Sequence, residues 1–200
     1  NISEARFEAK QKELEAKNIT PAAAADKVTL LRRATFDLTG LPPLPEEVAA
    51  FVADRSPKAF EKVVDRLLAS PHYGEKWARH WLDLARYADG DGFKADDTRP
   101  NIWRYRDYVI KSFNTDKPYD RFVKEQLAGD ELWPDDISLD GSYTLAPEKL
   151  KHREALTGTG LYALGPQIHE SNMDGKKIRY ETYTDWADTT GAAFLGLTLS

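Results

Sequence analysis

Apolar residues recur at intervals of three and four along most of the chain. Between Ser56 and Ser70, apolar side chains occupy positions 60, 63, 64, 67 and 68, which form one face of a helix. Ser56-Pro57 and Ser70-Pro71 are typical of helix boundaries. The same spacing predicts further helices over residues 4–17, 75–88, 101–113, 116–127, 147–156 and 179–197. No alternation typical of strands is convincing, so the sequence predicts a mainly α fold: a compact multi-helix domain with long loops and no convincing sheet.

The first 25 residues differ in character from the rest of the chain. Residues 4–17 are rich in Ala, Glu and Lys, which is typical of a surface helix, and Asp26 can cap the next helix. We therefore expect an N-terminal helical extension over residues 1–25 and a helical domain over residues 26–200. A chain of 200 residues buries enough surface to fold without disulfides or metals.

Composition and charge narrow the classes of function. The chain has no cysteine, which excludes disulfides, Cys-ligated zinc, iron–sulfur clusters and covalent haem attachment within these residues. The net charge of −5 argues against a nucleic-acid partner, because such proteins normally carry a basic face. No apolar run reaches the length of a membrane span.

One candidate for catalysis lies on the helix predicted over residues 75–88. His80, Asp83 and Tyr87 are three and seven residues apart, so they share one stripe of that helix. A carboxylate one turn from an imidazole can fix its tautomer and raise its basicity, as a hydrolase or lyase requires. The alternative is a partly buried histidine that simply bonds to Asp83.

Acidic residues come directly after that helix. Asp89, Asp91 and Asp96 lie in one short segment, and a calcium ion favours several oxygen ligands from one loop. The EF-hand pattern fails, because Phe93 and Lys94 stand where it needs an acid or amide and a glycine. A solvated acidic turn is the alternative to a calcium site.

Aromatic and guanidinium side chains alternate over residues 103–108. Trp103, Arg104 and Arg106 could contact sugars, bases or porphyrin propionates, since planar rings and forked donors suit all three. The alternative is an amphipathic helix whose arginines pair with nearby acids.

Five longer stretches resemble one known family in order along the chain. They are residues 31–43, LRRATFDLTGLPP; 68–83, LASPHYGEKWARHWLD; 100–110, PNIWRYRDYVI; 118–130, PYDRFVKEQLAGD; and 189–198, TTGAAFLGLT. Together they resemble a domain of unknown function that occurs in large planctomycete cytochrome c-linked proteins. One departure is Leu44, where the family usually has Thr or Ser, and it predicts a weaker helix start.

The resemblance implies a function linked to haem. In similar proteins, the segment that corresponds to residues 194–198 leads within a few residues into a Cys-x-x-Cys-His haem attachment site. We therefore expect a chain truncated before that site, whose partner is the C-terminal remainder of the same protein carrying haem c. Trp103, Arg104, Arg106 and Phe194 are then the candidate cofactor-binding residues, with carbohydrate as a candidate substrate.

The resemblance also implies an extracytoplasmic location, either periplasmic or secreted. The expected function is a helical module of a haem c-linked redox protein, active in electron transfer or as an oxidoreductase. The alternatives are a non-redox module that binds carbohydrate or a protein, and, less favoured, a hydrolase or lyase that uses His80. Because residues 194–199 are mostly apolar, we expect the final helix to be buried, either by the stretch that follows or by this chain itself.

Overall fold

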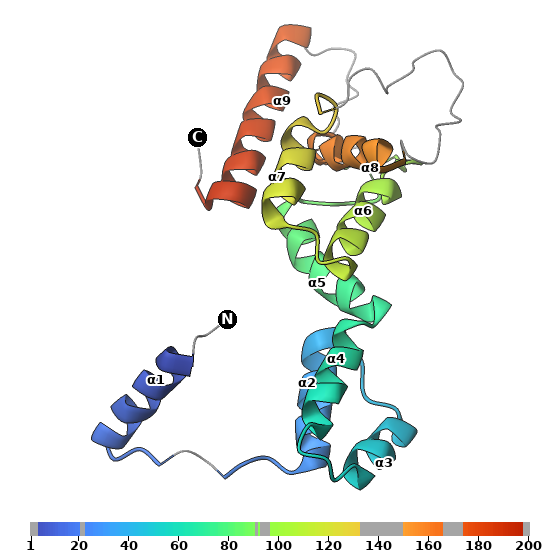
Figure 1. Cartoon of the computed structure of the whole chain (residues 1–200). Helices are drawn as coiled ribbons and strands as arrows, with labels where there is room; N and C mark the ends of the chain where they lie inside the picture. The colour runs from blue at the N-terminus through green and yellow to red at the C-terminus, as the bar shows by residue number, and fades with distance from the viewer. Residues whose placement is uncertain are drawn as a thin grey trace.

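The computed structural model describes residues 4–20, 23–90, 92, 97–132, 150–165 and 174–197. These residues are mainly helical (Figure 1), and they contain an isolated bridge between Gly90 and Thr98 but no strand. The mainly α prediction is confirmed. The α-helices are α1 (Glu4–Ala16), α2 (Lys27–Thr39), α3 (Pro45–Ala53), α4 (Ala59–Leu68), α5 (Pro71–Leu84), α6 (Trp103–Asn114), α7 (Tyr119–Ala128), α8 (Leu150–Gly158) and α9 (Gly175–Thr190).

Local chemistry accounts for several helix ends. The Asp26 carboxylate accepts a hydrogen bond from the Thr29 N–H at 2.9 Å and so caps α2. The Glu47 carboxylate accepts the Leu44 N–H at 2.9 Å, which satisfies a backbone donor at the start of α3 although Leu44 has no capping oxygen. Pro45 occupies the first position of α3, where a missing N–H costs nothing.

Helices α2, α3 and α4 share one hydrophobic cluster. Its members come from the inward faces of the three helices: Leu31, Phe51, Ala59, Val63 and Leu67. Val63 and Leu67 of the apolar stripe predicted from the sequence therefore lie in this cluster, whereas Phe60 and Leu68 are exposed. Helix α4 begins at Ala59, and Ser56-Pro57 form a turn before it.

A second cluster joins α5 to α6, α7 and the 3-10 segment Thr159–Ala163 that follows α8. Its buried members are Ala78, Trp81, Ala85, Tyr105, Tyr108, Val109, Phe122, Leu161 and Leu164. Helix α5 connects the two clusters, because it packs against α2 as well as α6 (Figure 1). Gly74 permits a close approach of α5 and α6, since a Cβ there would lie 2.5 Å from the Ile110 carbonyl oxygen.

The C-terminal segment is only partly buried. After α9 the chain forms a π-helical turn over Gly191–Leu195, and Gly196 ends it with φ of 65°. Phe194 packs against Trp81 with ring centroids 5.3 Å apart, as expected for a buried segment. Leu195 and Leu197, however, are 65% and 56% exposed. The described residues therefore cover Phe194 and leave Leu195 and Leu197 exposed, and burial of these two leucines by a following stretch stays a prediction.

Helix α1 lies apart from the other helices (Figure 1). From Glu8 onward its side chains are exposed, apart from the half-buried Leu14, which agrees with a surface helix. The division into an extension over residues 1–25 and a domain over residues 26–200 stays a prediction. None of the described helices combines the length and apolar character that crossing a bilayer requires.

Candidate functional site

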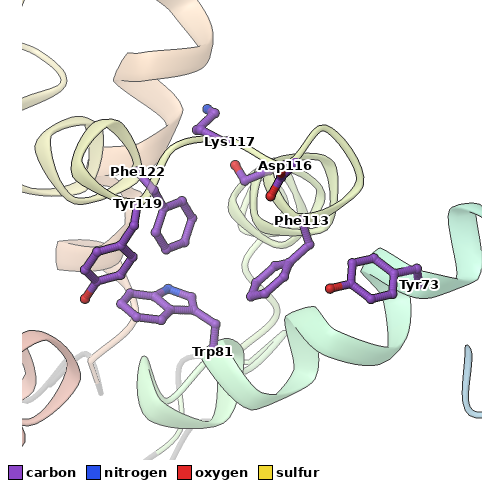
Figure 2. Close-up of a pocket in the computed structure, with 8 residues that line it drawn as sticks. Tyr73, Trp81, Phe113, Asp116, Lys117, Tyr119 and Phe122 are labelled. Carbon is purple, nitrogen blue, oxygen red and sulfur yellow. The ribbon is translucent and has the colours of Figure 1, made fainter. Parts of the chain in front are cut away.

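A pocket of about 240 Å³ opens between α5, α6 and the start of α7 (Figure 2). Most of its wall is aromatic, and two charged residues follow the end of α6. The lining residues are Tyr73, Trp81, Ser112, Phe113, Asp116, Lys117, Tyr119 and Phe122. Helix α5 supplies Tyr73 and Trp81 eight residues apart, which places them on one face.

Hydrogen bonds hold the ring of Trp81 in place. Its indole Nε1 donates to the Tyr105 hydroxyl and to Gln126 Oε1, both at 3.0 Å. The Tyr105 hydroxyl donates to the same Gln126 oxygen at 2.5 Å. Burial raises the pKa of Tyr105, so its hydroxyl keeps its proton and remains a donor. The polar edge of Trp81 is thus satisfied inside the protein, and only its apolar surface faces the pocket.

A buried ionic cluster supports the other side of the pocket. The fully buried Glu125 accepts hydrogen bonds from the Tyr108 hydroxyl at 3.0 Å, from Lys117 Nζ at 2.5 Å and from Arg121 Nε at 2.7 Å. Burial, and next the charge of Glu125, raise the pKa of Tyr108. Two cations and a hydroxyl therefore compensate this buried carboxylate, as its desolvation requires.

Lys117 is held by the same cluster. Its ammonium also bonds to Glu154 on α8 at 3.1 Å and lies 4.4 Å from the centre of the Tyr108 ring. In Figure 2 the nitrogen points away from the aromatic rings. Lys117 therefore contributes its hydrocarbon stem to the pocket and its charge to the core.

Asp116 is the other charged residue of the pocket, and it has an unusual backbone. Its φ is 47°, in the left-handed region, where it ends α6: the Asp116 N–H bonds to the Phe113 carbonyl and the Lys117 N–H to the Ser112 carbonyl. This is the Schellman arrangement, which glycine satisfies at the lowest cost. The Asp116 side chain is exposed, and no described residue bonds to its carboxylate.

The stripe proposed for catalysis is not joined by hydrogen bonds in the described part of the chain. His80 and Asp83 are both exposed, and the His80 ring lies 5.3 Å from that of Trp77. Tyr87 instead donates to Asp89 Oδ1 at 2.6 Å. Burial, followed by this bond, raises the pKa of Tyr87 to about 12. Catalysis by His80, Asp83 and Tyr87 stays a prediction.

The calcium site falls largely outside the residues that the structure describes. Asp91 and Asp96 lie outside the described residues, and Asp89 is engaged by the Tyr87 hydroxyl. Within the described ranges no group of three or more acidic, histidine or cysteine residues could hold a metal. A calcium site over Asp89, Asp91 and Asp96 stays a prediction.

Within the described part of the chain, the four predicted cofactor-binding residues lie in different places. Trp103 and Arg104 face a groove of about 510 Å³ between α6 and α8, and the Arg104 guanidinium lies 4.8 Å from the Trp103 ring centre. Arg106 bonds to the adjacent Asp107 at 3.0 Å. Phe194, by contrast, contacts Trp81 in the second hydrophobic cluster. The structure brings Trp103 and Arg104 together and leaves Phe194 elsewhere.

These residues do not fit an enclosed haem site. The groove that Trp103 and Arg104 face is open to solvent, and neither Arg106 nor Phe194 lines it. Trp103, Arg104 and Phe194 are divided between the α8 groove and the core. The described residues therefore form no haem pocket between them, and we derive no chemical step through one.

Sequence reasoning missed most of the pocket. The helical spacing of Trp81 predicts a core residue, and Trp81 is buried. Phe113, Tyr119 and Phe122 belong to no sequence motif that indicates a binding site, although they line the pocket. The available indication is the Asp116-Lys117-Pro118 turn, which brings the end of one aromatic-rich helix to the start of the next. Which faces meet across that turn depends on packing.

The chain belongs to the PSCyt2 family, described as a protein of unknown function (DUF1549), whose model matches residues 9–200. This confirms the resemblance to the planctomycete cytochrome-associated domain, and it assigns no activity. No curated protein and no solved structure matches the chain.

Proposed function

We propose that this chain is a ligand-binding helical module of an extracytoplasmic, haem c-linked redox protein. In this proposal a small ligand occupies the aromatic pocket, and the haem is carried by the C-terminal remainder of the protein. The observation that carries the binding role is the pocket itself, whose Trp81 ring is held by buried hydrogen bonds and whose Asp116 carboxylate has no partner among the described residues. The family resemblance supports the link to haem c.

The binding role is tested by the thermal stability of the purified protein. A ligand that binds only the folded state raises Tm with its concentration. We expect at least one compound from a panel of small organic cations, monosaccharides and aromatic acids to do so. Tyr119→Ala, which removes an exposed pocket ring, should reduce the rise, whereas Tyr180→Ala on α9 should leave it unchanged. A panel without any effect would contradict the binding role.

The link to haem is tested separately on the native protein from its source. The visible absorption spectrum should contain a Soret band, and cell fractionation should place the protein outside the cytoplasm. A native protein without that band would reject the redox association and leave the binding module by itself.

A second candidate function is carbohydrate binding in the groove between α6 and α8. The 41% exposed Trp103 with Arg104 beside it is the observation that favours this function, because an exposed ring and forked donors suit a sugar. Calorimetry should then detect oligosaccharide binding that Trp103→Ala abolishes and Tyr119→Ala leaves unchanged. Tyr105, two residues after Trp103 on α6, is buried in the core and does not contribute to this surface.

A further inference from the structure

We infer that the aromatic pocket binds a methylated ammonium group, such as the head group of choline. The inference rests on the proposed binding role of the pocket and names the chemical class of its ligand. Four features carry it: the charge of the lining residues, the orientation of the rings, the small number of free polar groups inside the pocket, and its size.

The charge that the pocket offers to a ligand is negative. Among the described residues that line it, Asp116 and Lys117 are the charged ones. The Lys117 ammonium is engaged by Glu125 at 2.5 Å and Glu154 at 3.1 Å and points away from the rings (Figure 2). The Asp116 carboxylate is exposed and has no partner in the described part of the chain. An entering cation therefore meets one free carboxylate and no competing free cation on the described wall.

The planes of neighbouring aromatic rings in the pocket are steeply inclined to one another. The Phe122 ring makes an angle of 71° with Trp81 at a centroid distance of 4.9 Å, and an angle of 68° with Phe113 at 6.4 Å. Tyr73 and Tyr119 extend the wall on either side (Figure 2). The faces of aromatic rings attract cations, and Trp does so most strongly. Several non-parallel rings can surround one such group.

The polar groups of Ser112 and Trp81 in the pocket are already used, whereas the hydroxyls of Tyr73 and Tyr119 bond to no residue in the described part of the chain. The Ser112 hydroxyl donates to the Tyr108 carbonyl at 2.8 Å, and the Trp81 N–H is shared by Tyr105 and Gln126. A sugar needs many hydrogen-bond partners, and a primary ammonium is strongly hydrated. With few free donors and acceptors in the pocket, neither ligand would regain the hydrogen bonds to water that it loses on binding. A methylated ammonium keeps few bonds to water and presents apolar methyl groups. The small volume, about 240 Å³, suits a head group of this kind.

The backbone at Asp116 provides a clean substitution. A residue with φ of 47° is best replaced by Asn, which tolerates the left-handed region as Asp does. Asp116→Asn therefore removes the charge and leaves the end of α6 intact. Asp37→Asn on α2, an exposed carboxylate outside the pocket, is the matched control.

Calorimetric titration of the purified protein tests the role of charge. The probes are choline, its uncharged isostere 3,3-dimethylbutan-1-ol, and ethanolamine as a primary ammonium. We expect choline to bind about tenfold or more tightly than either of the others. Asp116→Asn should weaken choline about tenfold and leave the isostere unchanged, and Asp37→Asn should change neither. Equal binding of choline and the isostere would overturn the inference, as would Asp116→Asn without effect.

A second variant locates the binding and separates two kinds of failure. Tyr119 is 61% exposed, so Tyr119→Ala can be made without opening the core, and it should weaken choline several-fold. One outcome is that choline does not bind, whereas glucose or benzoate binds and Tyr119→Ala abolishes that binding. The pocket is then a ligand site, and the inferred ligand class is wrong. If neither choline nor any panel compound binds at about 10 mM, both the class and the binding role fail.

Discussion

Three helices end in a left-handed residue that is not glycine: Asn18, Arg86 and Asp116. The left-handed conformation costs about 1–2 kcal/mol of stability for residues other than Gly, and Asn and Asp tolerate it best among them. Arg86 is the least suited to it, and its guanidinium forms two hydrogen bonds of 2.7 Å with Asp185 and contacts Thr189. The Asp116 side chain lines the aromatic pocket. At both positions the side chain makes a contribution that glycine would lack.

Lys117 should be the most sensitive charged residue of the pocket wall. Lys117 is almost fully buried between Glu125 and Glu154, so Lys117→Met leaves the buried Glu125 and the partly buried Glu154 with less compensating charge. We expect the free energy of unfolding to fall by about 3–5 kcal/mol in urea denaturation. Lys111→Met, which removes the exposed partner of Glu154, should cost about 0–1 kcal/mol. Equal losses in the two variants would show that burial is not the cause.

Glu154 predicts a dependence of stability on pH. Burial by itself would raise the pKa of its carboxyl, but hydrogen bonds from Lys111 and Lys117 outweigh that and lower it below 4.5. A carboxylate whose pKa falls on folding stabilises the protein above its unfolded pKa and loses that contribution as the pH falls through its folded pKa. The stability difference between the wild type and Glu154→Gln should therefore be constant near neutral pH and shrink below pH 4.5. An unchanged difference at about pH 3 would contradict this.

At the scale of elements, α9 is attached to the rest of the protein at a few points. Arg86 at the end of α5 holds Asp185 and Thr189, and Phe194 packs on Trp81. Tyr180 and Tyr183 on the same helix are 74% and 55% exposed. Helices with few buried contacts open more readily than those in a core.

Arg86→Gly separates the backbone cost from the side-chain contacts. Glycine relieves the left-handed residue, while the partly exposed ion pair with Asp185 is lost, so global stability should change by no more than about 1 kcal/mol. Amide hydrogen exchange over α9 should nevertheless become faster. Asp185→Asn, which weakens the ion pair and keeps the backbone of residue 86, should give the same increase. Unchanged exchange in both variants would show that Arg86 does not hold α9.

Helix positions were largely predictable because they depend on nearby residues. The spacing of residues 60, 63, 64, 67 and 68 placed α4, and Asp26 marked the start of α2. The final helix was less predictable: α9 begins at Gly175 and gives way to a π turn after Thr190, although the sequence is suited to a continuous helix. The candidate site was mostly missed, since a stripe on one helix does not reveal which other helix lies against it.

At the scale of the whole molecule, two hydrophobic clusters share α5. One cluster contains Leu31 and belongs to α2, α3 and α4, whereas the other contains Leu161 and belongs to α5, α6, α7 and the 3-10 segment after α8. Because α5 packs against both α2 and α6, each cluster depends on the same helix for its position. We therefore expect the two clusters to unfold together.

A matched pair of variants tests this coupling. Leu31→Ala and Leu161→Ala each remove a buried leucine, one from each cluster, and each should cost about 2–5 kcal/mol. Both variants should shift a single urea transition that is the same by circular dichroism and by tryptophan fluorescence. Two separate transitions, each moved by only one of the variants, would show that the clusters are independent.

The amino-acid sequence by itself determined the helical class, most helix positions, the absence of cysteine chemistry and the family. These features depend on composition or on residues within one or two turns of each other. Only the tertiary structure decided that Trp81 bonds to Gln126, 45 residues away in the sequence, and that Lys117 bonds to Glu154, 37 residues away. It also decided that five aromatic rings and one carboxylate without a described partner surround a single pocket. Such contacts depend on how helix faces pack against one another, and spacing within a helix does not specify its neighbour.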